Sequence, residues 1–558
     1  MSTPEPEIQF ELEPPPDAKV YVSTAKPKPP LTNEEWANLE KPKVLIIGAG
    51  IGGLMLGNFL QKGGIPFEIF ERMDIVKPLG SCMSIGGLFG PLFEQIGILD
   101  DLEAIGKLNI SLEYLREDLS RLFVMDTSER LELTGANEYI VSRPELYNLL
   151  LRQIPKEKIH MSKKVLSFMQ NEDGVMIRCA DNQTHHGDIL VGADGAHSAV
   201  RQHLYKELKQ KKKLPSSDDV PLPFNCVCLV GQTEVLDPEE FPDLNLPYSK
   251  FNSVLGSNDF SWARATTKQN TVCWLVARFL TKETSKQHDS FRNSEWGPEA
   301  AEAMCKEVRD FKVPGGKEGK VTTIGDLIDR TPKHLISKVM LEEKIFDTWF
   351  GGRTVLLGDA CHKLNPAGGA GALTAIQDGV ALANWICALQ SKKASEIEES
   401  FKEYHAERYP LVKESYEMSK LFKHIAGKSY ASMLIRAVFT RLPRFLWRQI
   451  LIKRCLARPQ LSFLPLVEDK GTVPPIYQAS LHKTLEILKR RAEDQAKEAS
   501  STNATVAEFR VGPEAAEAMC QIVRDYKVPI RDDRMATIGD LIDKTLKDLI
   551  SRPYWKTG

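Results

Sequence analysis

The first part of the chain alternates short apolar runs with amphipathic stretches. Residues 43–47 (KVLII) predict a buried strand, residues 54–61 predict a helix, and residues 66–71 (PFEIFE) predict a second strand. A run of glycines joins the first strand to the helix. The order strand, helix, strand is that of a βαβ unit, in which the two strands lie parallel in one sheet.

The same pattern returns twice further along the chain. Residues 143–152 predict a helix, and residues 188–191 predict a strand that ends at a Gly-Ala-Asp-Gly turn. Residues 354–357 (TVLL) predict another buried strand, which is followed by Gly-Asp, a glycine-rich turn and a helix over 372–383. We therefore expect a Rossmann-like domain that is assembled from three separated segments, 41–115, 140–205 and 340–425.

A different pattern lies between the second and third segments. Residues 222–285 contain runs such as CVCLVGQTEV and TVCWLVARFL, separated by polar turns, which predicts antiparallel sheet. Trp262 and Trp274 are expected in the core of this sheet. The predicted fold class is thus α/β, with an inserted antiparallel-sheet substrate domain at 206–339 and helices at the C-terminus.

The two ends of the chain differ from this body. Residues 1–40 are rich in Pro, Glu and Lys, which predicts a disordered tail, and residues 426–500 read as a basic helical region. Residues 512–551 repeat residues 297–337, so that GPEAAEAMCKEVRDFKVP recurs as GPEAAEAMCQIVRDYKVP. Two copies do not make a solenoid. We interpret residues 501–558 as a partial duplicate, which either competes for the place of the first copy or stays loosely packed.

Length, charge and cysteine usage set the broad class. A chain of 558 residues is too long for one core and indicates two or more domains. The formal net charge of -2 gives no attraction to nucleic acid, so we expect no such partner. The ten cysteines are scattered without metal-ligand spacing, which predicts no metal site and suits an intracellular, reducing compartment. The N-terminus lacks the apolar core of a signal peptide.

The glycines after the first strand carry the first chemical signal. Gly48, Gly50 and Gly53 have the spacing G-x-G-x-x-G, which supplies a tight turn, close backbone approach to a pyrophosphate, and close packing of helix on strand. The motif follows a strand and opens a helix, as a dinucleotide site requires. Glu71, at the end of the second strand, is placed to bind ribose hydroxyls, and Arg72 to reach the adenine or a phosphate.

Two further motifs follow later strands. The second is GADGAHS over 192–198, followed by Arg201. The third is GDACHK over 358–363, followed by Pro366 and by GGAGA over 368–372. In this order and spacing, the three motifs resemble class A flavoprotein monooxygenases of the para-hydroxybenzoate hydroxylase fold, over roughly residues 43–470. The HK-x-x-P form of the third motif is similar to that of fungal FAD monooxygenases, including ring-epoxidising enzymes of terpenoid pathways.

The resemblance implies that particular residues bind FAD. It implies that Glu71 binds the AMP ribose and that Arg143 contacts the phosphate region of the flavin nucleotide. It places Asp194 and Gly195 behind the flavin, near the path of the reduced nicotinamide. Gly80 is a further candidate for the cofactor site.

The second and third motifs supply the remaining candidates. The resemblance implies that Arg201 is important for activity and that Asp359 binds the ribityl or pyrophosphate region. Gly371 and Ala372 are expected against the flavin at a helix start, whose positive end stabilises negative charge on the reduced ring. Many family members have G-Q-G-x-N where this chain has GAGAL over 369–373, so a polar pair is missing here.

Three polar residues each leave two interpretations open. Tyr248 in the inserted sheet is either a catalytic residue that faces the substrate or a half-buried surface tyrosine. His362 is either catalytic or a structural histidine at its turn, and we favour the structural role. Asp378 contributes to the site or pairs within its own helix.

A basic stretch lies near the C-terminus. Between Glu417 and Glu468 there are ten Lys and Arg and no acidic residue, and apolar residues are interleaved with them. A spanning helix needs about 20 mostly uncharged residues, which the arginines interrupt. The stretch either contacts an anionic membrane surface through residues 428–470 or packs on the body with a solvated basic face.

These features together predict an FAD-dependent monooxygenase. It is expected to use NAD(P)H as a transient co-substrate and O2 to hydroxylate or epoxidise a small apolar or aromatic substrate through a flavin C4a-hydroperoxide. The absence of a second G-x-G-x-x-G fits a nicotinamide that docks and leaves. The alternatives are a flavin-dependent dehydrogenase or reductase, which consumes no O2, and a non-catalytic flavoprotein. A flavin halogenase is disfavoured because no W-x-W-x-I-P stretch is present.

Overall fold

A computed structural model describes most of the chain. The described residues are 41–76, 82–220, 222–256, 259–280, 298–317, 321–365, 369–426, 437, 441, 443–506, 527–530 and 534–537. The predicted tail at 1–40 lies outside them. The chain divides into two compact units, Met1–Lys489 and Arg490–Gly558, and each is described by itself.

A six-stranded sheet forms the centre of the first part of unit 1. Its strands are parallel except for the antiparallel edge strand β21, so the carboxyl ends of the inner strands lie along one edge. The strand order is β21 (Phe350–Gly351), β22 (Thr354–Leu356), β12 (Ile189–Gly192), β1 (Val44–Ile47), β2 (Phe67–Phe70) and β8 (Ile159–His160). Four of these strands coincide with those predicted from sequence. Three separated segments therefore contribute to one sheet, as expected.

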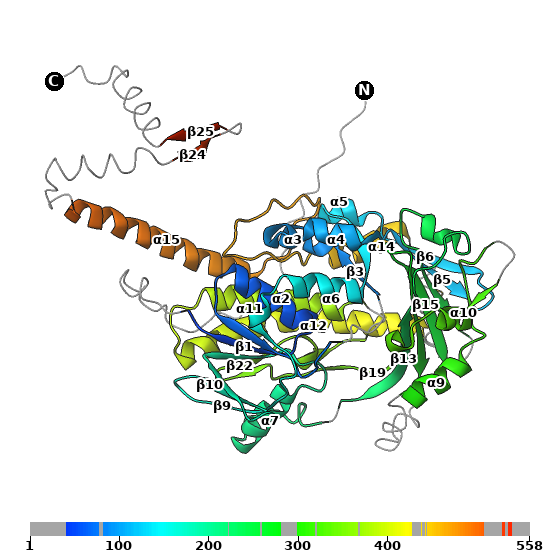
Figure 1. Ribbon diagram of the computed structural model, residues 1–558, viewed down its shortest axis with the longest axis horizontal. Coiled ribbons are helices and arrows are strands. Elements are labelled where there is room, and N and C mark those ends of the chain that lie inside the picture. The colour runs from blue at the N-terminus through cyan, green and yellow to red at the C-terminus, as the bar shows by residue number, and fades with distance from the viewer. Residues whose placement is uncertain are drawn as a thin grey trace. The chain divides into compact units, whose positions relative to one another are not determined.

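Helices cover one face of this sheet and a small sheet covers the other (Figure 1). The face covered by helices carries α2 (Ile51–Lys62), α6 (Arg143–Arg152), α11 (Gly371–Cys387) and α12 (Ala394–Ala426). On the opposite side lie α7 (Ala199–Gln210) and the antiparallel strands β9 (Val165–Gln170), β10 (Val175–Cys179) and β11 (Thr184–Gly187). The predicted helices are confirmed, and α11 is longer at both ends than the sequence pattern indicated.

A seven-stranded sheet is the second large sheet of unit 1. All its neighbouring strands are antiparallel except β14 and β5, which are parallel. The order is β19 (Ser337–Glu342), β13 (Phe224–Gln232), β16 (Val272–Phe279), β15 (Phe260–Thr266), β14 (Phe251–Leu255), β5 (Ser111–Arg116) and β6 (Arg121–Asp126). The sheet thus takes in two strands that precede residues 206–339, and the expected segment boundary at 115 falls inside β5. Long-range pairing of this kind leaves no local sequence signal.

The first copy of the repeated segment packs on this sheet. Helices α9 (Pro298–Glu307) and α10 (Ile324–Asp329) flank a short hairpin of β17 (Lys312–Val313) and β18 (Thr322–Thr323). Their apolar side chains share a buried cluster with Trp262 and Trp274, which are 3% and 1% exposed. The expectation that both tryptophans belong to the sheet core is confirmed.

The second copy forms a matching hairpin within unit 2. Strands β24 (Lys527–Ile530) and β25 (Arg534–Thr537) pair antiparallel, with Lys527 opposite Thr537. The first copy pairs Lys312 opposite Thr323, which are the equivalent positions of the repeat. The repeated sequence therefore keeps its local pairing register.

A third, smaller sheet and several short elements complete unit 1. The sheet has the order β3 (Cys82–Gly86), β7 (Glu138–Ser142) and β4 (Lys107–Leu108), and β7 leads directly into α6. Short elements near it are α3 (Gly90–Ile96), α4 (Leu99–Ile105) and α5 (Arg130–Thr134). Strands β20 (Lys344–Ile345) and β23 (His362–Lys363) form a separate pair.

The basic C-terminal stretch contains α14 (Arg444–Cys455), and a later helix, α15, covers Ala479–Val506. The inner face of α14 is buried through Leu451 and Cys455, next to Leu133 of α5. Arg448 forms ion pairs with Glu129 and Glu132. Packing on the body is therefore observed for α14. Within the described part of the chain, no helix has the length and apolar character needed to span a bilayer.

Candidate FAD site

The turns after β1 and β12 approach each other closely. Gly48, which follows β1, has a φ of +107°, and a Cβ there would lie 2.5 Å from the carbonyl oxygen of Ala193. A side chain at this position would have to displace backbone, so only glycine allows both turns to meet. The carboxyl ends of neighbouring parallel strands are where open α/β sheets bind ligands.

The other two glycines of the first motif have opposite surroundings. A Cβ on Gly53 would lie 2.0 Å from the carbonyl oxygen of Gly48, so this glycine is needed for helix α2 to pack against the strand. A Cβ on Gly50 would meet no atom within 4 Å. Open space therefore lies in front of Gly50, where the N-terminus of α2 presents free N–H groups.

Glu71 closes the far side of this turn. Its carboxylate accepts hydrogen bonds from the backbone N–H of Ala49 at 2.9 Å and of Met73 at 3.0 Å. The hydroxyl of Tyr147 on α6 is buried without a hydrogen-bond partner among the described residues. Burial first, and the nearby Glu71 second, raise the pKa of Tyr147 to about 12. Sequence reasoning missed Tyr147, because only the packing of α6 brings it near Glu71.

The two arginines predicted beside this region are exposed. Arg72 follows Glu71 in a bend, and Arg143 is the first residue of α6. Their roles toward FAD stay predictions. Gly80 lies outside the described residues.

Asp194, in the second motif, has one carboxylate oxygen that is hydrogen-bonded and one that is not. Its Oδ2 accepts hydrogen bonds from the N–H groups of Ala199 at 2.7 Å and Val200 at 3.3 Å, at the start of α7. Its Oδ1 is buried with no partner in the described part of the chain. Burial raises the pKa of Asp194, although the hydrogen bonds at the start of α7 oppose this. Next to it, a Cβ on Gly195 would meet open space.

Arg201 joins the second motif to the third. Its guanidinium donates to the carbonyl oxygen of Ala360 at 2.7 Å and of Ala196 at 2.6 Å, and it lies 4.2 Å from the ring centre of Phe346. The side chain is buried, and that burial lowers its pKa. The contacts that the structure gives Arg201 are therefore those of a residue that positions two turns.

The third motif presents a carboxylate and a helix start. Asp359 lies in the turn after β22 and is paired with Lys363. Helix α11 begins at Gly371, where a Cβ would meet no atom within 4 Å, and Ala372 follows in the first turn. The open space at Gly50, Gly195 and Gly371, together with the bare Oδ1 of Asp194, fits a long ligand such as FAD along this edge.

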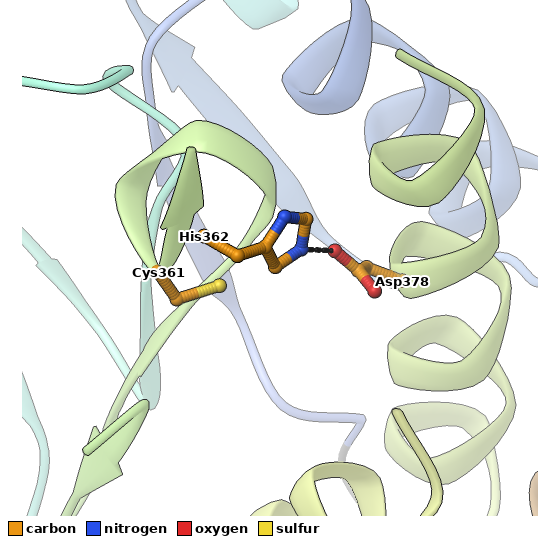
Figure 2. A group of neighbouring side chains, drawn as sticks. All are labelled: Cys361, His362 and Asp378. Atoms are coloured by element: carbon orange, nitrogen blue, oxygen red, sulfur yellow. Dashed lines mark hydrogen bonds and ion pairs between the residues drawn. The ribbon is translucent and has the colours of Figure 1, made fainter. Parts of the chain in front are cut away.

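His362 and Asp378 meet in the core behind the third motif (Figure 2). Nε2 of His362 lies 2.5 Å from Oδ2 of Asp378, and both side chains are fully buried. Oδ1 of Asp378 accepts a hydrogen bond from Nε of Arg408 at 2.8 Å. Burial raises the pKa of Asp378, but His362 and Arg408 outweigh it and hold the pKa below its usual value. Asp378 thus pairs with other elements, and the expectation of pairing within its own helix is wrong.

Cys361 completes a group with metal-binding side-chain types. The ligand atoms of Cys361, His362 and Asp378 lie within 4.8 Å of one another. Burial holds the pKa of the Cys361 thiol well above its usual value, which disfavours the thiolate that a metal requires. Arg408 and His362 already occupy the carboxylate. The chemistry of this group is that of an ion-paired core cluster.

Tyr248 is not part of the turns that form this edge. It bridges to Leu108 of β4, is half-buried, and has the amine of Lys250 at 5.9 Å from its ring. This position joins the third sheet to the seven-stranded sheet. A role toward substrate therefore stays a prediction.

A cavity of about 430 Å³ opens beside α7. Basic side chains and two aromatic rings line it, among them His197, Arg201, Lys206, Tyr205 and Phe346, and the acidic side chains of Asp218 and Asp219 line it as well. His197 is paired with Glu342 at 3.1 Å. Lys206 is exposed, and none of the described residues forms an ion pair with it.

Comparison with known proteins identifies the family. The FAD binding domain family matches residues 41–227 and 323–419, together about half of the chain. The FAD-dependent monooxygenase dpasE of Apiospora sacchari is 28% identical over 440 residues, which cover 76% of this chain and 87% of that protein. The FAD-dependent monooxygenase ausM of Emericella nidulans is 27% identical and covers 77% of this chain and 88% of its own.

Solved structures share the fold. The Klebsiella pneumoniae protein HpxO, solved with FAD and uric acid, aligns with a TM-score of 0.57 and 19% identity, over 75% of this chain and 96% of its own. The tetracycline destructase Tet(51) aligns with a TM-score of 0.54 and 17% identity, over 75% of this chain and 98% of its own. The chain belongs to the FAD binding domain family and is a flavoprotein oxidoreductase of the FAD-dependent monooxygenase group.

Proposed function

We propose that this protein uses NAD(P)H and O2 to insert one oxygen atom into a small apolar or aromatic substrate, by hydroxylation or epoxidation. The observation that carries the proposal is the open space at Gly50, Gly195 and Gly371, together with the unpaired Oδ1 of Asp194, in the three motifs that follow β1, β12 and β22. Bound FAD would supply the electron transfer and the activation of O2.

The residues of this edge would hold the two halves of FAD. The N–H groups of α2 at Gly50 bind the pyrophosphate, because a helix N-terminus favours negative charge. Glu71 accepts hydrogen bonds from the ribose, and Arg143 contacts the phosphate region. Asp359 binds the ribityl or pyrophosphate region, and the N-terminus of α11 at Gly371 stabilises negative charge on the reduced ring.

The cavity beside α7 is the proposed docking place of the reductant. It adjoins Arg201 and His197, which follow Asp194 and Gly195 in the second motif, and its basic side chains suit the phosphates of NAD(P)H. Exposed Lys206 is placed to favour NADPH, which carries one more phosphate than NADH. Lys206→Glu should therefore raise the KM for NADPH about tenfold while changing the KM for NADH less. An equal change in both constants would contradict docking of that phosphate here.

Oxygen uptake tests the activity itself. The protein loaded with FAD is mixed with NADPH and a panel of apolar and aromatic compounds in an oxygen electrode. Uptake of O2 that depends on both FAD and NADPH, and that a compound stimulates while gaining one oxygen atom, supports the proposal. Reduction of flavin without O2 uptake would instead identify a dehydrogenase or reductase, and bound flavin that NADPH never reduces would indicate a non-catalytic flavoprotein.

A further inference from the structure

One carboxylate holds both ends of the turn that carries Asp359. Oδ2 of Asp378 accepts a hydrogen bond from the backbone N–H of Gly358 at 3.3 Å and lies 2.5 Å from Nε2 of His362. Asp359 lies between these two anchors and pairs with Lys363 instead. The position of Asp359 is therefore set by Asp378, which does not touch it.

The same carboxylate belongs to the helix that begins at the proposed flavin site. Asp378 lies on α11, seven residues after Gly371, which is about two turns. A helix of this length is stiff, so a shift of α11 along its axis moves Asp378 with it. Figure 2 shows Asp378 projecting from α11 toward the turn that carries His362. The helix start and Asp359 are thus coupled through the buried carboxylate of Asp378.

A third element fixes the carboxylate from the other side. Arg408 of α12 donates from Nε to Oδ1 of Asp378 at 2.8 Å and from a terminal nitrogen to Oε1 of Gln377 at 3.0 Å. The three side chains His362, Asp378 and Arg408 are at most 4% exposed. A buried carboxylate without partners is strongly destabilising. Asp378 is therefore held at the position where it contacts both His362 and Arg408.

We propose that His362, Asp378 and Arg408 form a positioning clamp that sets the distance between Asp359 and the N-terminus of α11, and thereby orients FAD between them. The clamp rests on the proposed placement of FAD. It assigns His362 and Asp378 a role in cofactor geometry, which an ion cluster that only adds stability would not have. Residues that support a binding site from behind determine how closely the binding side chains keep their productive geometry.

The first test exchanges single atoms at two buried positions of α11. Asp378→Asn removes the charge of the clamp, and Asn384→Asp is the matched control. Asn384 is fully buried on the same helix but bonds to residues 460 and 462, away from the Asp359 turn. Both variants are expected to lower the melting temperature. Only Asp378→Asn should raise the Kd for FAD, by about tenfold, and shift the midpoint potential of the bound flavin.

The second test asks whether the conservative substitution rescues the cofactor site. His362→Gln keeps a side-chain N–H that can donate toward Asp378, whereas His362→Leu removes it. We expect the FAD affinity and flavin potential of His362→Gln to stay near those of the wild type, and His362→Leu to resemble Asp378→Asn.

Two results would overturn the clamp. One is an unchanged Kd and potential in Asp378→Asn at temperatures where the protein stays folded. The other is an Asn384→Asp control that shifts both quantities as much. Failure of the FAD site itself is distinguished from these, because the wild type would then bind no FAD in the same titration.

Discussion

The space around each glycine of the first motif shows whether that glycine serves ligand binding or the packing of the helix. A Cβ on Gly53 would overlap backbone, whereas one on Gly50 would point into open space. The spacing of the motif identified all three glycines but not this difference. Because the surroundings differ, a substitution at Gly50 tests ligand binding and one at Gly53 tests folding.

Gly50→Ala is expected to leave the FAD-free protein as stable as the wild type and to weaken FAD binding by about tenfold or more, because the methyl group fills the space of a phosphate. Gly53→Ala should instead cost about 3 kcal/mol of unfolding free energy or more, through overpacking. Thermal melts of FAD-free protein and flavin-fluorescence titrations check both. Full FAD affinity in Gly50→Ala would exclude a pyrophosphate at this turn.

The ionised carboxylate of Asp194 is expected to lower the stability of the folded protein at neutral pH. Since its folded pKa is raised, the folded state keeps the proton longer than the unfolded state does, and stability falls as pH rises above about 4, the ordinary Asp pKa. Asp194→Asn removes this term. The melting temperature of FAD-free Asp194→Asn should therefore gain on the wild type by a few degrees between pH 4 and pH 7. A difference that does not grow with pH would show that Asp194 carries no such penalty.

At the scale of elements, local patterns predicted four strands of the six-stranded sheet and the helices α2, α6 and α11 that cover it. KVLII and TVLL are apolar runs too short for helices, and the glycines after them marked the strand ends where the site lies. The pairing of β5 with β14 joins residues far apart in the chain, which periodicity cannot register. Sequence patterns also missed contacts within the site, because these form only once the helices are packed. Asp378 then meets His362 and Arg408, and Tyr147 lies near Glu71.

The basic stretch near the C-terminus packs on the body through one face of α14, which limits where it could contact a membrane. Leu451 and Cys455 bury the inner face of α14, and Arg448 is used in ion pairs with α5. Phe445 at the start of the helix is nevertheless 67% exposed, next to Leu446 at 42%. A peripheral membrane contact within 428–470 is therefore predicted to act through the start of α14.

Phe445→Glu combined with Leu446→Glu should at least halve co-sedimentation with anionic liposomes, since two apolar side chains are replaced by charges. Val235→Glu is the control, because Val235 is an apolar residue of 70% exposure in the seven-stranded-sheet region. Deleting residues 428–470 is a poorer test, because it also removes Leu451 and Leu461 from the buried core. Equal sedimentation of all three proteins would exclude this membrane contact.

At the scale of the whole molecule, the family match and the described cores fall in the same part of the chain. All five buried clusters consist of described residues before 474, and the FAD binding domain family matches nothing beyond 419. The repeated segment of unit 2 keeps the hairpin register of its first copy.

A chain ended after residue 506 should keep the melting temperature of the main transition within about 2 °C and bind FAD with unchanged affinity, because its buried clusters stay complete. The comparison is made by calorimetry and FAD titration of both proteins. A marked loss of either property would mean that the second copy contributes to the folded body.

Binding of FAD at the carboxyl edge of the six-stranded sheet underlies both the proposed function and the proposed clamp. The most direct measurement is a titration of the purified, FAD-free protein with FAD, followed by visible absorption and flavin fluorescence. We predict saturation at one FAD per chain, with a perturbed flavin spectrum that free FAD does not show. A protein that folds with a cooperative melt yet leaves the FAD spectrum unchanged throughout the titration would contradict the account.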